Sequence, residues 1–172
     1  MKMKNKYIVR ENSSGKTREL LEFAKGLNDK FELSKTVADD YFEPGMMENL
    51  EQYRGEYNEQ VNMLLLRVES KGLRYDNQTQ NLERVLVGDE VKIIRDMDNP
   101  YNSNNFAIKS NRSEALGNLP AELCNALAPL YDAGYATILT ATVSYIERLK
   151  DRSRYAKQGV MFVELNIKMR GI

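Results

Sequence analysis

Two groups of residues have types and spacings that could support catalysis. Gly15-Lys16-Thr17 matches the end of a phosphate-binding loop, in which backbone amides and a lysine hold nucleotide phosphates. That pattern needs a glycine five residues before Gly15, and the sequence has Arg10 there, so it does not predict an ATPase. The carboxylates Asp89-Glu90 and Asp96/Asp98 have the chemistry of a metal site or an acid-base pair. A solvated loop explains them at least as well, so we assign no catalytic and no metal-binding residue.

The usual nucleophiles and zinc ligands are scarce. Histidine is absent, and cysteine occurs once, at Cys124. The chain therefore lacks the usual zinc ligands, the Ser-His and Cys-His nucleophile pairs, and any internal disulfide. Cys124 falls on the apolar side of a predicted helix, where we expect a buried structural thiol. We expect a protein that is not an enzyme and uses no cofactor, with a carboxylate-only, metal-dependent nuclease as the least supported hypothesis.

The charge balance limits how the chain could bind nucleic acid. Lysine plus arginine number 25 and aspartate plus glutamate number 25, so no global positive field attracts phosphates. Basic residues do gather between two predicted strands, opposed within that span only by Asp151: Arg148, Lys150, Arg152, Arg154 and Lys157. This loop either binds backbone phosphates or is a solvated hairpin tip, and the sequence favours neither reading.

Composition and hydropathy indicate a soluble chain. Hydrophobic residues make up 42% and charged residues 29%, which is typical of a globular protein with a core. The longest aliphatic run, Met63 to Leu66, is far shorter than the roughly 20 residues of a membrane span. The N-terminus is basic, but no apolar segment follows it, so we expect no secretory signal and a cytoplasmic location.

The first 60 residues have a helical pattern. Apolar residues recur there at spacings of three and four: Leu20, Leu21, Phe23, Ala24 and Leu27. They predict a helix near 16–28, capped by Ser13 or Ser14, and Pro44-Gly45 is expected to separate two further helical pieces. We predict a helical N-terminal extension over residues 1–60.

From residue 61 the pattern changes to strands. Strands are predicted over 61–68, 82–87, 91–95, 106–109, 115–119, 137–149 and 159–169. Pro120 suits the first turn of an inserted helix that ends at Gly134, and Pro129 is expected to kink or shorten it. Short strands with one inserted helix predict a mainly β domain with α, folded as a small, partly open barrel over 61–172.

A series of short motifs runs through this second region. They are Gly72-Leu73-Arg74-Tyr75, Val87-Gly88-Asp89, the run from Ile94 to Asn102, Ala107-Ile108-Lys109, Leu116-Gly117-Asn118-Leu119-Pro120 and Leu127-Ala128-Pro129-Leu130. The Asn-Pro-Tyr turn before the Ala-Ile strand and the Gly-x-Leu-Pro start of the helix are specific when taken together. In this order and spacing the motifs resemble the HIRAN domain, which occurs in helicase-like transcription factors and alone in small bacterial proteins. The match covers roughly residues 61–170.

The resemblance implies an OB-like or SH3-like barrel that captures the 3′ end of single-stranded DNA in a pocket. Tyr75 and Tyr101 would offer faces on which two terminal bases stack, each worth about 1–3 kcal/mol without sequence preference. Arg74 is the natural phosphate partner because its guanidinium can make two parallel bonds. Pro100 would hold Tyr101 in position at low entropic cost. The alternative for both rings is ordinary packing or turn structure.

Two positions depart from the family pattern. Where DNA-binding members carry an aspartate that accepts the terminal 3′-hydroxyl, this sequence has Asn102, which accepts without charge assistance, in a longer turn. Asn118 and Ala121 stand where such members carry basic or imidazole groups. We therefore expect weaker recognition of the strand end. The predicted DNA-binding residues are Arg74, Tyr75, Asn99, Tyr101, Asn102, Asn118, Arg152 and Arg154.

Two hypotheses about function follow. The first is a non-enzymatic module that holds the 3′ end of single-stranded DNA in repair or replication and directs a helicase or nuclease partner. The second is a protein-interaction module, or a homodimer formed through residues 1–60, with no DNA binding. It requires an exposed apolar patch on the extension, made of Met46, Met47, Leu50, Tyr53 and Tyr57.

Overall fold

The computed structural model describes residues 15–41, 52–58 and 62–170, with side chains in the first range described up to residue 33. The elements are α1 (Gly15–Tyr41), β1 (Gly55–Asn58), β2 (Met63–Glu69), α3 (Gln78–Asn81), β3 (Lys92–Asp96), β4 (Asn105–Lys109), β5 (Ala115–Asn118), α4 (Ala121–Asp132), β6 (Ala136–Glu147) and β7 (Val160–Met169). Short 3-10 turns lie at 82–84 and 149–151. Within the described ranges, no helix is both long and apolar enough to cross a membrane.

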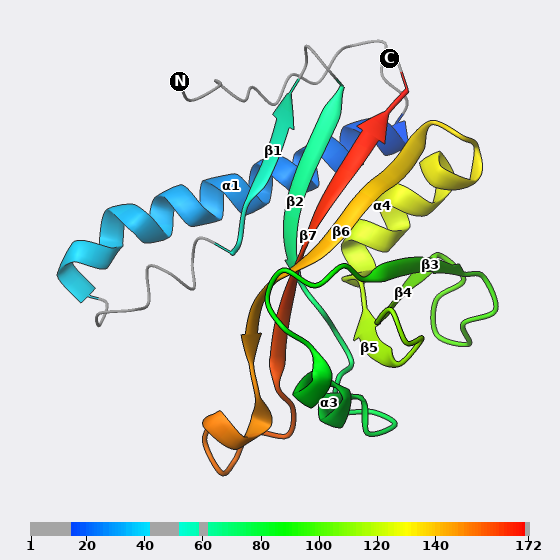
Figure 1. The fold of residues 1–172 in the computed structure, drawn as a ribbon. Helices are drawn as coiled ribbons and strands as arrows, with labels where there is room; N and C mark the ends of the chain where they lie inside the picture. The colour runs from blue at the N-terminus through cyan, green and yellow to red at the C-terminus, as the bar shows by residue number, and fades with distance from the viewer. Residues whose placement is uncertain (1–14, 42–51, 59–61, 171–172) are drawn as a thin grey trace.

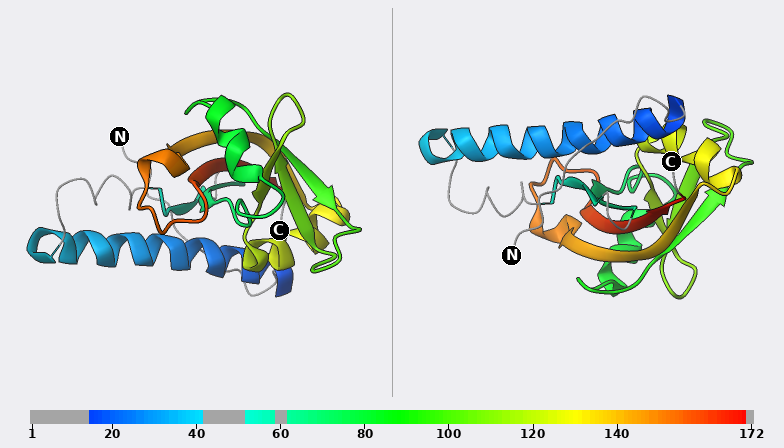
Figure 2. Two further views of the ribbon diagram at one scale, coloured as in Figure 1. Left: turned by 90° about the horizontal axis from the view of Figure 1, so that it is seen from below. Right: turned by 90° about the horizontal axis from the view of Figure 1, so that it is seen from above.

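The N-terminal helix α1 is longer than the predicted 16–28 and spans 27 residues. Its apolar stripe is buried as expected, with Leu20, Leu21 and Ala24 fully inaccessible. The helix packs against α4 and β1 and runs along one side of the molecule (Figures 1 and 2). The predicted caps at Ser13 or Ser14 and the predicted break at Pro44-Gly45 lie outside the described residues.

Four antiparallel strands form the larger sheet, in the order β1-β2-β7-β6. Alternate residues of β2 are buried, so that Leu64, Leu66 and Val68 face the core. In β7, Val163 and Leu165 lie opposite Val68 and Leu66. Because the side chains of a strand alternate between two faces, this register places both apolar sets on the same side.

Strand β1 corrects two expectations. Residues 55–58 were expected to continue the helical pattern, but they pair with β2, with Tyr57 opposite Leu64. Tyr57 is only 3% exposed, and Tyr53 packs edge-on against Phe162 with ring centroids 4.8 Å apart. Tyr57 is therefore not part of an exposed patch, whereas Tyr53 remains partly exposed. The other residues of the expected patch, Met46, Met47 and Leu50, lie outside the described residues.

The smaller sheet has the order β3-β4-β5 and is also antiparallel. Isolated bridges join it to the larger sheet, Lys71 with Asn118 at one side and Glu90 with Thr142 at the other. Three backbone hydrogen bonds join residues 88–91 to β6, but none in the described part of the chain links β3 itself to β6. The prediction of a mainly β, partly open barrel with an inserted helix is confirmed, and its strands lie within two residues of their predicted positions, with one exception.

The exception is the predicted strand at 82–87, which is wrong. The chain there forms α3, a 3-10 turn and a loop. Leu82 and Val85 are buried, whereas Leu86 and Val87 are 65% and 62% exposed. The buried residues Leu82 and Val85 are three positions apart, a spacing that suits a helical turn and not a strand. The strand was predicted from the aliphatic composition without regard to this spacing.

Helix α4 closes one end of the core. Leu123 and Leu127 are fully buried, and the helix ends at Asp132, one turn after Pro129. Burial raises the pKa of the Cys124 thiol, and its Sγ lies 3.6 Å from Leu119 O. Cys124 is thus a buried structural residue, as predicted. Helix α1, helix α4 and both sheets contribute to one hydrophobic core, and the division at residue 60 stays a prediction.

Gly55 provides a test of the packing between α1 and β1. A Cβ at this position would lie 2.7 Å from Ala24 Cα and closer still to the Ala24 carbonyl oxygen, both of which are backbone atoms. We expect Gly55→Ala to lower the free energy of unfolding by about 1–3 kcal/mol, because the helix must shift. Urea denaturation measures the change.

The matched control is Gly26→Ala in α1, where no atom lies within 4 Å of the added Cβ. Alanine there should leave stability unchanged or raise it by up to about 1 kcal/mol. Equal effects of the two substitutions would contradict the close approach of β1 to α1.

Candidate nucleic-acid interface

A groove of about 710 Å³ lies between the loop that starts at Gly72, the turn from β3 to β4, and β5. It gathers residues that are far apart in the sequence. Five of the predicted DNA-binding residues line it: Tyr75, Asn99, Tyr101, Asn102 and Asn118. Arg74, Arg152 and Arg154 lie outside its lining. The structure thus brings the aromatic and amide candidates together in one lining to which none of the three arginines belongs.

Both predicted stacking rings are open to solvent. Tyr75 is 57% exposed and Tyr101 is 95% exposed. Tyr101 is held through its backbone, because the Asn99 side-chain oxygen accepts from Tyr101 N at 3.0 Å and from Asn102 N at 3.1 Å. Asn99 therefore shapes the turn that presents the ring. The alternative of ordinary packing does not apply to rings this exposed.

Arg74 contacts the first of these rings directly. Its guanidinium carbon lies 4.8 Å from the Tyr75 ring centroid, and its Nη2 donates to the Tyr75 hydroxyl at 2.6 Å. The backbone N of Arg74 donates to Gln158 Oε1 at 3.1 Å, which connects this loop to the hairpin between β6 and β7. Such a cation–π pair supports the ring from one side and keeps a positive charge beside it.

The amide of Asn102 is engaged within its own turn. Asn102 Nδ2 donates to Asn125 Oδ1 at 3.0 Å, and Asn102 Oδ1 accepts from Asn104 N at 3.0 Å. The oxygen that was expected to accept a 3′-hydroxyl thus already forms a turn. These contacts fix the direction of the Asn102 side chain within the turn.

Asn118 forms the floor where the two sheets meet. Its backbone exchanges hydrogen bonds with Lys71 at 2.8 and 2.9 Å, and its Oδ1 accepts from Asn105 Nδ2 at 2.9 Å. Gly117 beside it has φ +86°, and an added Cβ would lie 2.7 Å from Lys71 O. Only glycine fits this backbone and this close approach.

Two further residues that position the site were not predicted. Arg95 donates through Nε and Nη2 to both carboxylate oxygens of Asp132 at 3.0 Å, and through Nη1 to the carbonyls of Ser103 and Asn105 at 2.7 and 3.1 Å. It thereby ties the turn between β3 and β4 to α4. Asn105 is 7% exposed and contacts the groove. In the sequence, Asn105 was indicated only by its place in the run of asparagines within the longer turn.

The basic loop is partly neutralised by acids outside its own span. Lys150 and Arg148 lie 3.7 and 3.9 Å from Glu83, and Arg152 lies 3.6 Å from Glu147. The remaining candidate, Arg154, forms no ion pair with any described residue. Its Nη2 donates to the Tyr155 hydroxyl at 2.7 Å and its guanidinium lies 4.9 Å from that ring, the arrangement seen at Arg74-Tyr75.

The predicted carboxylate pairs have structural partners. Asp89 Oδ2 accepts from Leu86 N at 2.9 Å, and Asp96 Oδ2 accepts from the side chains of Asn99 and Asn105 at 3.1 Å. In the part of the chain that the structure describes, no cluster of three or more acidic, cysteine or histidine side chains could hold a metal ion.

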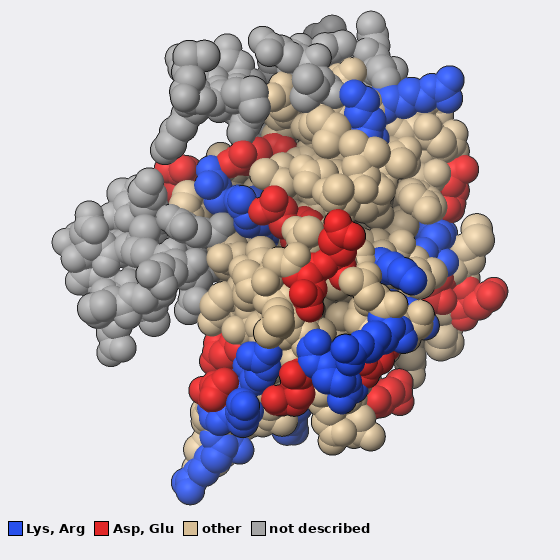
Figure 3. Space-filling view, viewed as in Figure 1, with Lys and Arg blue, Asp and Glu red and all other residues tan. Residues whose placement is uncertain are grey.

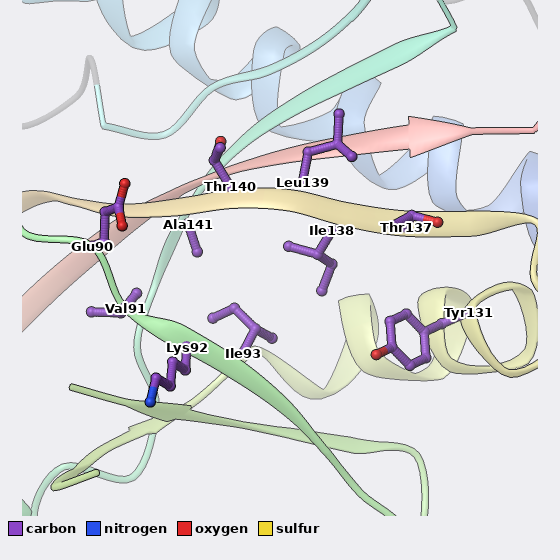
Figure 4. A pocket seen from close by; sticks show the side chains of 10 residues that line it. All are labelled: Glu90, Val91, Lys92, Ile93, Tyr131, Thr137, Ile138, Leu139, Thr140 and Ala141. Atoms are coloured by element: carbon purple, nitrogen blue, oxygen red, sulfur yellow. The ribbon is translucent and has the colours of Figure 1, made fainter. Parts of the chain in front are cut away.

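A second cavity, of about 360 Å³, lies in the open seam between β3 and β6. Figure 4 shows Val91 and Ala141 at its narrow end, Ile93 and Ile138 facing each other, and Tyr131 of α4 at the other end. None of the predicted DNA-binding residues lines it.

Arg95 gives a test of how the groove is held. Its side chain is 11% exposed, so we expect Arg95→Ala to lower the free energy of unfolding by about 1.5–3 kcal/mol through lost charged hydrogen bonds. Hydrogen exchange should accelerate at the amides of residues 97–105. Arg84→Ala is the control, since its ion pair with Glu114 is exposed and screened by solvent. Unchanged exchange at 97–105 in Arg95→Ala would contradict this anchor.

Three solved structures are similar to this chain. The crystal structure of the HIRAN domain of human HLTF is 24% identical, with 61% of this chain and 76% of that chain covered and a TM-score of 0.46. A crystal structure of a protein from Lactobacillus plantarum is 20% identical, with 62% of this chain and 96% of that chain covered and a TM-score of 0.49. The NMR structure of the HLTF HIRAN domain in its DNA-bound conformation is 23% identical, with 61% of this chain and 75% of that chain covered and a TM-score of 0.40.

No curated protein matches this sequence. The family model of the HIRAN domain matches residues 63–160, which is more than half of the chain. This match agrees with the motif order and covers β2 to the start of β7. The chain belongs to the HIRAN domain family.

Proposed function

We propose that this chain is a non-enzymatic module that binds single-stranded DNA in the groove, with a preference for a free 3′ end. The observation that carries the proposal is the presence of two exposed tyrosines, Tyr75 and Tyr101, on one groove. A tyrosine ring that is 95% exposed gains nothing from the core, whereas a base stacked on it would gain about 1–3 kcal/mol. The DNA-bound HLTF HIRAN domain supports the same class of ligand.

Local charge supports this proposal better than the net charge does. Figure 3 shows lysines and arginines gathered over the lower part of one face, around the tip of the β6–β7 hairpin and the region of α3, with acidic side chains among them. Arg74 lies beside the Tyr75 ring, and Arg154 has no acidic partner among the described residues. Both are free to pair with phosphates next to stacked bases.

The proposed biological setting is DNA repair or replication, in the cytoplasm. A module that holds a strand end without cutting it would direct a partner enzyme, a helicase or a nuclease, to that end. This setting rests on the family alone.

Single substitutions in the groove test the proposal. We expect Tyr101→Ala and Arg74→Ala each to weaken binding of a fluorescent single-stranded oligonucleotide about tenfold or more, because a contact worth roughly 1.4 kcal/mol is lost. Changing the base sequence should have little effect. Fluorescence anisotropy gives the dissociation constants.

Tyr135→Ala is the matched control, since Tyr135 is 51% exposed and lies outside the groove. It should bind like the unmodified protein. Unchanged affinity in both Tyr101→Ala and Arg74→Ala would reject this groove as the DNA site.

The basic loop is tested through the salt dependence of binding. If Arg154 neutralises one phosphate, Arg154→Ala should reduce the slope of log affinity against log salt by about 0.7, the value for a single strand. Arg18→Ala, on an exposed position of α1, should leave the slope unchanged. Equal slopes for both variants would show that the hairpin tip is merely solvated.

A further inference from the structure

The amide of Asn105 is the most constrained polar group that lines the groove. Asn105 is 7% exposed, yet it belongs to the groove lining. Its Nδ2 makes two hydrogen bonds, to Asp96 Oδ2 at 3.1 Å and to Asn118 Oδ1 at 2.9 Å. Both hydrogens of this nitrogen are therefore used inside the protein.

The carboxylate of Asp96 fixes which way this amide points. An ionised carboxylate only accepts hydrogen bonds, so it must face Asn105 Nδ2 and not Oδ1. The same carboxylate oxygen accepts from Asn99 Nδ2 at 3.1 Å. Asp96 thus orients two amides of the groove through one fixed charge.

The oxygen of Asn105 is left as an acceptor that faces the groove. Among the described residues, Asn105 Oδ1 has no hydrogen-bond partner, and the fully buried unpartnered side-chain atoms belong to Gln52 and Arg54 instead. The Asn105 oxygen is therefore accessible from the groove that its residue lines. An acceptor that no protein group uses can take a hydrogen bond from a ligand in the groove, and that bond favours binding.

Asn118, which is hydrogen-bonded to Asn105 and lines the same groove, contributes a donor. Because its Oδ1 accepts from Asn105, its Nδ2 points the other way, 3.4 Å from Lys71 O and toward Gly72 of the groove wall. One Nδ2 hydrogen stays available. A hydroxyl group can donate to Asn105 Oδ1 and accept from Asn118 Nδ2. A phosphate ester oxygen can only accept, so it cannot form a hydrogen bond with Asn105 Oδ1.

We infer that Asn105, oriented by Asp96, accepts the hydrogen bond of the terminal 3′-hydroxyl, and that Asn118 Nδ2 donates to the same hydroxyl. This inference rests on the proposed function and assigns to Asn105 the role expected of Asn102, whose oxygen already accepts one hydrogen bond within its turn whereas Asn105 Oδ1 accepts none. Asp96 is a positioning residue here.

A series of strand ends tests the inference on the unmodified protein. Oligonucleotides of one sequence carry a 3′-hydroxyl, 3′-amino, 3′-fluoro or 3′-phosphate end, and anisotropy gives each affinity. The hydroxyl and amino ends, which donate, should bind at least fivefold more tightly than the fluoro and phosphate ends. Equal binding of the fluoro and hydroxyl ends would overturn the inference and leave single-strand binding standing, whereas failure of every oligonucleotide to bind would overturn the proposed function itself.

Two substitutions then assign the preference to residues. Asp96→Asn should reduce the ratio of hydroxyl to fluoro affinity below twofold. The ratio is the readout because Asp96 also holds Asn99, so both affinities can change together. Exposed Asp98→Asn is the control that keeps the full ratio. Asn102→Asp restores the family's carboxylate at the other candidate position. If Asn102→Asp raises the ratio while Asp96→Asn keeps it, Asn102 reads the hydroxyl and the assignment to Asn105 is wrong.

Discussion

The groove depends on the close approach of β5 to the segment after β2. Lys71 and Asn118 pair through their backbones, and this bridge joins the smaller sheet to the larger one. The approach is possible because Gly117 has no side chain and adopts φ +86°. A larger residue would push the sheets apart and move Asn118, the floor of the groove, away from Tyr75. One glycine thereby determines whether residues more than 40 positions apart form a single site.

Around this bridge five amide side chains line the groove, together with apolar and aromatic residues and the charged residues Lys71 and Asp76. Asp96 orients Asn99 and Asn105, and Arg95 holds the same turn against α4. The charged groups act on the backbone and on amide direction, so the surface itself presents fixed donors and acceptors. A fixed amide costs little reorganisation when a ligand arrives, which compensates in part for the missing charge of a carboxylate at Asn102.

The sequence predicted the fold class and the aromatic members of the site because both depend on local patterns. Alternating apolar residues placed most strands, and the Asn-Pro-Tyr turn placed Tyr101 on the surface. The segment at 82–87 failed because aliphatic content was read without its spacing. Strand β1 failed because its pairing with β2 is a tertiary interaction that four residues cannot encode by themselves.

The polar members of the site were harder to predict for a related reason. The partners of Arg95 and Asn105 lie on other elements, and the direction of an amide depends on a neighbour that only the fold supplies. Likewise, Asn102 is a candidate by its place after the turn tyrosine, but its oxygen accepts from Asn104 N within the turn, a contact that only the fold reveals. Residue type identified the candidates, and only three-dimensional contacts distinguished a free acceptor from an occupied one.

The position of β7 has a consequence for isolating the module. The match to the family model ends at residue 160, where β7 begins, yet β7 lies in the middle of the larger sheet, between β2 and β6. A fragment trimmed to the recognised stretch would lose its central strand and expose the inner faces of both neighbours. A fragment intended to fold should therefore extend beyond the matched stretch, at least to the end of β7 at Met169.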